Sequence, residues 1–252
     1  MTMKLIVYLI NLDGSDERLR SASSQLRQFG IEYERIPAVD GRGKSPNDFQ
    51  EVDVDRAWQY LGRPLSGGEV GCYLSHVECA KRFLASDADV CLVLEDDIQL
   101  HLSLFLEVLR QAVQVLPQGW DVINFGNQKN KIYSNLQHFQ LDGTSVHLVK
   151  AHYFPMTTTG LCWSRSGAEA FIRDAFPVFA SVDRFLRHWQ TRRARGYCFM
   201  PPLVSTTGVV SDISRPAKTA RLSLCEKCIY GLKKQLNMIL DKAIAYQKKF
   251  LF

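Results

Sequence analysis

A short apolar run that ends in three consecutive carboxylates constrains the fold of this 252-residue chain more than any other feature. Residues 90–94 have the length and composition of a buried strand, and Glu95, Asp96 and Asp97 follow directly. Open α/β sheets place their ligand sites beyond the carboxyl ends of the strands, so we expect the three acids to emerge at such an edge. The alternative is a solvated strand end whose acids serve only as helix caps.

The charge of the acidic triplet itself indicates a ligand. Three adjacent carboxylates repel one another unless a cation or strong hydrogen-bond donors offset their charge. A hard divalent ion, Mn²⁺ or Mg²⁺, takes oxygen ligands and usually shares them with a substrate phosphate. The triplet therefore predicts a site for a metal ion and a phosphate-containing ligand.

Composition places the chain among ordinary globular proteins, with 46% hydrophobic and 23% charged residues. The seven cysteines are an odd number in a chain without a secretory signal, which favours a reducing compartment. The apolar start at residues 5–10 is too short for a signal sequence or a membrane span, so it predicts an N-terminal strand. We therefore expect a cytoplasmic protein.

Strand and helix patterns alternate along the chain. The first strand is followed by a helical stripe at residues 16–29 and a second strand at 31–39. Ser66 and Glu69 have capping-box spacing, which predicts a helix leading into the acidic strand. This order indicates one α/β domain at residues 1–214, with a mainly parallel central sheet flanked by helices.

The C-terminal segment at residues 215–252 differs from the rest in charge. It holds nine Lys or Arg residues against two acids, and apolar residues alternate with them. Such a basic amphipathic helix is typical of segments that lie on anionic membrane surfaces. The alternative is a helix that docks its apolar stripe on the core. Because the basic charge is confined to this segment and no recognition module is evident, we expect no nucleic-acid partner.

Several short motifs together resemble glycosyltransferase family 25. They occur in the family's order within the first hundred residues, and the likeness weakens beyond about residue 185. The matching blocks are residues 7–13, 16–18, 37–41, 65–76 and 93–97, with looser blocks at 160–168 and 182–183. The family includes bacterial lipopolysaccharide and lipooligosaccharide glycosyltransferases and the collagen galactosyltransferases. The missing signal sequence and the basic tail favour the bacterial branch.

The resemblance implies a GT-A-like fold and transfer of a hexose, usually galactose or glucose, from a UDP-sugar with inversion at the anomeric carbon. The acceptor would be the growing oligosaccharide of a lipid-linked lipopolysaccharide or lipooligosaccharide. The basic tail would then hold the enzyme peripherally on the inner face of the inner membrane, where such an acceptor is made.

The resemblance also implies roles for the acids and their neighbours. Asp97 would ligate Mn²⁺ or Mg²⁺ directly. Glu95 would take part in the metal site or face the ribose, and Asp96 would support them. At the end of the first strand, polar side chains are expected to contact the nucleotide, although the arginine among them could instead pair with an acid. These residues are Asn11, Asp13 and Arg18.

Inversion requires a base that removes a proton from the acceptor hydroxyl. Asp183 is our candidate, with a helix N-cap as its alternative role. His76 lies on the helix before the acidic strand and could contact the donor or the acids, or be structural. Ser211 and Asp212 could close over the diphosphate, and Arg215 could offset its charge.

Two other classes of protein remain open at this point. A Mg²⁺-dependent phosphoryl-transfer enzyme also places acids after an apolar strand, although the glycines at residues 41–43 lack the spacing of a phosphate-binding loop. A noncatalytic, membrane-associated sugar-binding protein could use the acids for a structural ion. Metal-dependent turnover of a UDP-sugar would separate these classes.

Overall fold

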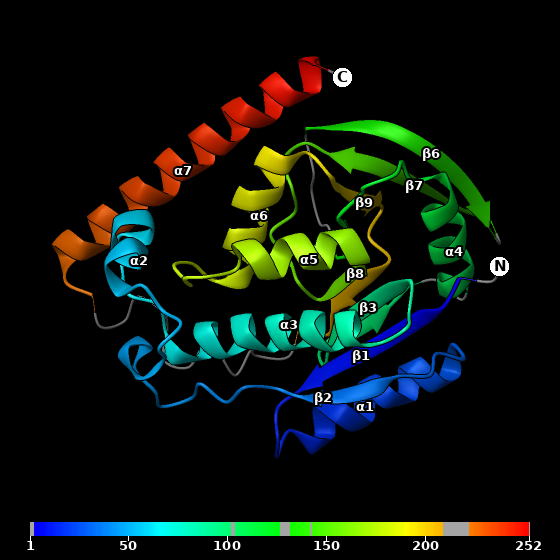
Figure 1. The fold of residues 1–252 in the computed structure, drawn as a ribbon, viewed down its shortest axis with the longest axis horizontal. Coiled ribbons are helices and arrows are strands. Elements are labelled where there is room, and N and C mark those ends of the chain that lie inside the picture. The colour runs from blue at the N-terminus through cyan, green and yellow to red at the C-terminus, as the bar shows by residue number, and fades with distance from the viewer. Residues whose placement is uncertain (1–2, 102–103, 127–131, 142, 209–221, 252) are drawn as a thin grey trace.

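The computed structural model describes residues 3–101, 104–126, 132–141, 143–208 and 222–251. The strands of its main sheet are β1 (Leu5–Asn11), β2 (Glu34–Pro37), β3 (Val90–Glu95), β5 (Val122–Asn124), β6 (Tyr133–Leu141), β7 (Thr144–Ala151), β8 (Gly160–Ser164) and β9 (Gly196–Met200). Their order across this eight-stranded sheet is β2-β1-β3-β8-β5-β9-β7-β6 (Figure 1). Two further strands, β4 (Ile98–Leu100) and β10 (Val204–Thr206), form a separate antiparallel pair.

The main sheet is mixed, but most of its strands share one direction. β1 pairs in parallel with β2 and β3, and β5 pairs in parallel with β9. β8 runs antiparallel between β3 and β5, and β7 runs antiparallel to β9 and β6. Six of these eight strands therefore point the same way, which confirms the expected mainly parallel central sheet flanked by helices.

Helices cover both faces of the sheet (Figure 1). They are α1 (Asp16–Gln28), α2 (Val54–Leu61), α3 (Gly67–Ala85), α4 (Phe105–Val115), α5 (Arg165–Asp174), α6 (Val182–Arg193) and α7 (Leu224–Phe250), with a 3₁₀ turn, η1 (Pro46–Asp48). Along β3, Cys91 and Val93 belong to one hydrophobic cluster, and Leu92 and Leu94 belong to the other. The strand is uniformly apolar because both of its faces are buried.

Local sequence signals set several helix ends. Gly30, with φ of 63°, follows the C-cap of α1. The predicted capping box at Ser66 and Glu69 opens α3, and Glu69 also forms a buried ion pair with Arg63, with nitrogen–oxygen distances of 2.7 and 2.8 Å. Residues 166–169 also have capping-box spacing, but Ser164 caps α5 instead, because the helix begins directly at the end of β8.

Helix α7 packs against α6 and α2 through polar contacts (Figure 1). Arg184 donates a hydrogen bond to the hydroxyl of Tyr230 at 2.9 Å, and Asn237 donates to the carbonyl of Tyr60 at 2.8 Å. Asp241 is buried and lies 2.7 Å from a guanidinium nitrogen of Arg192. The helix therefore does dock on the body of the protein, as the alternative interpretation expected, through a face that combines these polar residues with the buried Ala245.

The apolar stripe of α7 points away from the body of the protein. Its spacing of three and four residues places it on the side of the helix opposite Asp241. The exposed apolar residues of this stripe are Leu224, Leu232, Leu236, Ile239, Leu240, Tyr246 and Phe250. Among the residues that the structure describes, no helix combines the length and apolarity needed to cross a bilayer.

Candidate active site

The acidic triplet lies at the end of β3, beside the carboxyl end of the parallel strand β1. Asp96 and Asp97 form the tight turn that joins β3 to β4. The amide of Glu95 donates to the carbonyl of Thr159 at 3.1 Å, and the amide of Thr207 donates to the carbonyl of Asp97 at 2.8 Å. The backbone that presents the acids is thus held by segments far away in the sequence.

Asp96 is neutralised by neighbours from the first β-α unit. Arg18 forms an ion pair with it, and the amide of Asn11 donates a hydrogen bond to it at 2.7 Å. Asn11 is itself buried and accepts from Arg35 at 2.9 Å, so its side chain is bonded on both sides within the protein. The acid-pairing role that the sequence left open for Arg18 is therefore present.

Asp13 lies at the surface, with a side chain that is 79% exposed and an ion pair to Arg35. Neither Asp13 nor Asn11 is among the residues that line the two cavities described below. Ser211, Asp212 and Arg215 lie outside the described residues.

Glu95 is held in its ionised form. The Nε2 atom of His76 lies 3.1 Å from its carboxylate, and the hydroxyl of Thr158 donates to the same oxygen at 2.6 Å. Burial acts to raise the pKa of Glu95, but His76, Thr158 and the charge of Arg18 together lower it below its ordinary value. His76 thus contacts the acidic cluster, as one of its sequence-based interpretations expected.

The pKa of Asp97 is shifted in the opposite direction from that of Glu95. Burial and the negative charge of Glu95 raise the pKa of Asp97 to about 6, despite the opposing charge of Arg18. A nitrogen of Arg18 lies 3.7 Å from one carboxylate oxygen, whereas the buried Oδ1 has no hydrogen-bond partner among the described residues. A buried carboxylate oxygen without a donor, next to a second carboxylate held ionised, fits a hard divalent cation.

A cavity opens beside the triplet. Arg18 and Arg42 supply positive charge, and four acids, Asp40 and the triplet, supply negative charge. Arg42 forms an ion pair with Asp40 at 2.8 Å, as Arg18 does with Asp96. The lining comes from β1, the loop after β2, α3 and the β3–β4 turn, and consists of Ile10, Leu12, Arg18, Ala38, Val39, Asp40, Gly41, Arg42, Gly68, Cys72, Ser75, His76, Glu95, Asp96 and Asp97. One cavity is therefore lined both by carboxylates, which could bind a cation, and by arginines, which could bind an anion.

The loop that carries Arg42 packs tightly on the start of α3. A Cβ atom added at Gly41 would lie 1.8 Å from the carbonyl oxygen of Gly67, so only glycine allows this approach. The amide of Val39 also donates to the hydroxyl of Ser75 at 2.9 Å. These contacts fix the loop against the helix and place Arg42 at the cavity.

A second cavity adjoins the first, and Cys72 and Glu95 line both. Its wall consists of Glu69, Cys72, Glu95, Met156, Thr157, Thr158, Thr159, Ser181, Val182 and Asp183. The structure therefore brings Asp183 and the acidic triplet, which are far apart in the sequence, to two cavities with a common wall.

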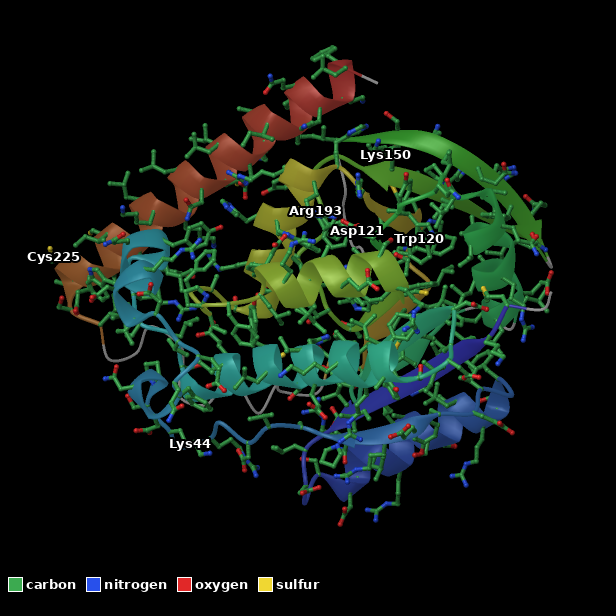
Figure 2. All side chains as sticks on the ribbon, in the orientation of Figure 1. Lys44, Trp120, Asp121, Lys150, Arg193 and Cys225 are labelled. Carbon is green, nitrogen blue, oxygen red and sulfur yellow. The ribbon has the colours of Figure 1, made fainter. Side chains whose placement is uncertain are left out.

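Asp183 lies in the first turn of α6. The helix N-cap is Ser181, so the alternative of Asp183 as the N-cap is wrong. The hydroxyl of Ser181 instead donates to the carboxylate of Asp183 at 2.5 Å. At its other end α6 is anchored by the buried Asp121, whose carboxylate lies 2.7 Å from Arg193 (Figure 2). This anchor holds the helix that positions Asp183.

Several residues that line the two cavities were not identified as site residues from the sequence, among them Arg42, Thr158 and Cys72. Arg42 lies within a glycine-containing turn, Thr158 lies in a run of threonines, and Cys72 has the helical spacing of a core residue. Only the position of Cys72, four residues before His76 on one helix, gave a local signal.

Comparison with known proteins identifies the family to which this chain belongs. The model of the family described as glycosyltransferase family 25 (LPS biosynthesis protein) matches residues 4–186. The chain therefore belongs to glycosyltransferase family 25. It is 31% identical to a glycosyltransferase 25 family member of Anopheles gambiae over 190 residues, which cover 71% of this chain and 31% of that protein.

More distant relatives carry a more particular name. The chain is 26% identical to procollagen galactosyltransferase 1 of Danio rerio over 227 residues, covering 82% of this chain and 37% of that protein. It thus spans about a third of the length of these two relatives. A glycosyltransferase involved in the glycosylation of the major capsid of PBCV-1 superposes with a TM-score of 0.44 at 7% identity, covering 92% of this chain and 99% of that structure.

Proposed function

We propose that this chain is a metal-dependent, inverting glycosyltransferase. It transfers a hexose from a UDP-sugar to the growing oligosaccharide of a lipopolysaccharide or lipooligosaccharide. Galactose is the first candidate for this hexose. Membership of family 25 and the galactosyltransferase names of relatives support a transferase of this kind. The observation that carries the proposal is the pair of adjoining cavities with Glu95 in their common wall.

The first cavity would receive the donor. Glu95 and Asp97 would hold Mn²⁺ or Mg²⁺, which when bound offsets the negative charge that grows on the diphosphate as the sugar leaves. Arg18 and Arg42 line the same cavity and would bind phosphate oxygens. Asn11 would orient Asp96, and Asp13 would act only from the rim, since its side chain is largely exposed.

The second cavity would receive the acceptor, with Asp183 as the base. Its carboxylate would take the proton from the acceptor hydroxyl while that oxygen forms a bond to the anomeric carbon. The bond from the anomeric carbon to the UDP oxygen breaks on the opposite face, and UDP leaves with the electron pair. The Ser181 hydroxyl, 2.5 Å from the carboxylate, would orient Asp183 for this transfer.

Helix α7 would hold the catalytic domain at residues 1–214 on an anionic membrane surface. Its polar face contacts α2 and α6, so its exposed apolar stripe is left to enter the headgroup region. Lysines such as Lys233, Lys242 and Lys249 flank that stripe and would face anionic lipid headgroups. A lipid-linked acceptor on the inner face of the inner membrane would then lie close to the second cavity.

The test is UDP release from a panel of UDP-sugars with an oligosaccharide acceptor. Consumption of one UDP-hexose with formation of an inverted linkage supports the proposal. Binding of a sugar nucleotide without turnover would favour the noncatalytic sugar-binding protein. Turnover of a nucleoside triphosphate would favour the phosphoryl-transfer enzyme.

A further inference from the structure

A sulfur, a nitrogen and an oxygen ligand meet where the two cavities join. Cys72 and His76 lie four residues apart on α3 and therefore share one face of the helix. Glu95 faces them from the end of β3, and one ligand atom from each of the three residues lies within 4.8 Å of the other two. Among the described residues, this group does not include Asp97.

We propose that Cys72, His76 and Glu95 form a site for a thiophilic divalent ion such as Zn²⁺, separate from the Glu95–Asp97 site for a hard ion. Thiolate, imidazole and carboxylate are the three ligand types that zinc accepts, and three protein ligands leave one position open. Mn²⁺ and Mg²⁺ prefer oxygen ligands alone. The ligand chemistry thus assigns different ions to the two sites.

The environment of His76 supports a ligand role. Its side chain is 1% exposed, and it lines the first cavity. Its Nε2 atom lies 3.1 Å from the carboxylate of Glu95, so this nitrogen faces the other ligand atoms of the group. In a Zn²⁺ site Nε2 would bind the ion, and the other ring nitrogen, Nδ1, would carry the proton.

Sharing of Glu95 has a functional consequence, which rests on the proposed function. The carboxylate of Glu95 cannot coordinate both ions fully. Binding of Zn²⁺ at the thiol site should therefore weaken the binding of Mn²⁺ at the Glu95–Asp97 site. Binding of Zn²⁺ would release the thiol proton of Cys72 to solvent. Because Cys72 and Glu95 line both cavities, a bound Zn²⁺ would also lie between donor and acceptor.

The test uses Cd²⁺, whose bond to a thiolate gives an ultraviolet charge-transfer absorption that requires no turnover. The full chain is titrated in a Cys225→Ser, Cys228→Ser background, because these two exposed cysteines on α7 could bind Cd²⁺ themselves. We expect one Cd²⁺ per chain, displaced by Zn²⁺. Adding Cys72→Ser should abolish the absorption and weaken Cd²⁺ binding by more than about tenfold.

Glu95→Gln is a second variant, which should keep the thiolate absorption but weaken Cd²⁺ binding. The proposed site would be excluded by an absorption that stays unchanged after Cys72→Ser. It would also be excluded if the Cys225→Ser, Cys228→Ser background gave no absorption. Competition is measured separately by the magnetic resonance signal of free Mn²⁺, which Zn²⁺ should increase. If Mn²⁺ does not bind but Cd²⁺ does, the hard-ion site of the proposed function fails while the thiol site stands.

Discussion

Arg18 of α1 forms an ion pair with Asp96, the middle acid of the triplet, and contacts Asp97 only at 3.7 Å. Arg18 therefore offsets the charge of Asp96 directly and the charge of Asp97 only weakly. This asymmetry agrees with the raised pKa of Asp97, about 6, which burial and the charge of Glu95 produce. It leaves Asp97 as the acid of the triplet whose charge a further cation would stabilise most.

The first prediction concerns stability without divalent ions. Asp97→Asn should stabilise the protein at pH 7 by up to about 3 kcal/mol, because the native structure holds this carboxylate ionised against a raised pKa. Urea unfolding in EDTA measures the difference. The matched control is Asp87→Asn, an exposed acid at the other end of β3. A destabilised Asp97→Asn variant would contradict the electrostatic account.

The difference in the free energy of unfolding between the native chain and Asp97→Asn should depend on pH, and its pH dependence follows from the direction of the pKa shift of Asp97. The pKa of Asp97 is raised in the folded state, so the cost of its charge is fully present above pH 6 and disappears as the pH falls toward the value for the unfolded chain, about 4. The free energies of unfolding of the native chain and Asp97→Asn should therefore converge between pH 6 and pH 4. A gap that stays constant over this range would exclude Asp97 as its source.

The ion pair at Asp96 makes the opposite prediction. Arg18→Gln should destabilise the protein by about 3 kcal/mol, because Asp96 would remain buried without its cation. Arg20→Gln, an exposed residue on the same helix, is the control and should change little. Equal effects of the two substitutions would show that the pair contributes nothing specific.

Asp183 should act in the chemical step alone. Asp183→Asn is expected to lower kcat by about 100-fold or more while leaving UDP binding within about twofold. The control is Asp55→Asn, an exposed acid in the first turn of α2. Unchanged kcat would remove Asp183 as the base, and a large loss of UDP binding would reassign it to the donor cavity.

The outward stripe of α7 should determine membrane binding. Replacing Leu232, Leu236 and Leu240 by Ser is expected to reduce binding to anionic liposomes by more than about tenfold, with little change in unfolding temperature because these side chains are exposed. Val115→Ser, which removes an exposed apolar side chain from α4, is the control. Unchanged liposome binding of the triple variant would exclude this face as the anchor.

Local signals predicted the parts of the fold that depend on neighbouring residues. The strand 90–94, the helix at residues 16–29 and the Ser66–Glu69 capping box each arise from a few adjacent side chains. Helix α2 was missed because its eight residues are too few to establish a clear period. The helix that carries Asp183 was expected, but not that Ser181 would cap it.

The candidate site depends on pairings that no short segment encodes. Thr158 reaches Glu95 because the neighbouring β8 runs antiparallel between β3 and β5. Arg42 reaches the first cavity because Gly41 packs on the start of α3. The outward direction of the α7 stripe could not be predicted either, since it is set by polar contacts such as that between Asp241 and Arg192.

The metal-dependent site is tested most directly by UDP release from a UDP-hexose, measured with Mn²⁺ or with EDTA for the native chain, Asp97→Asn and Asp87→Asn. We expect turnover by the native chain and by Asp87→Asn in Mn²⁺, and its loss in EDTA or with Asp97→Asn. Turnover that survives both EDTA and Asp97→Asn would contradict a metal-dependent site at the acidic triplet.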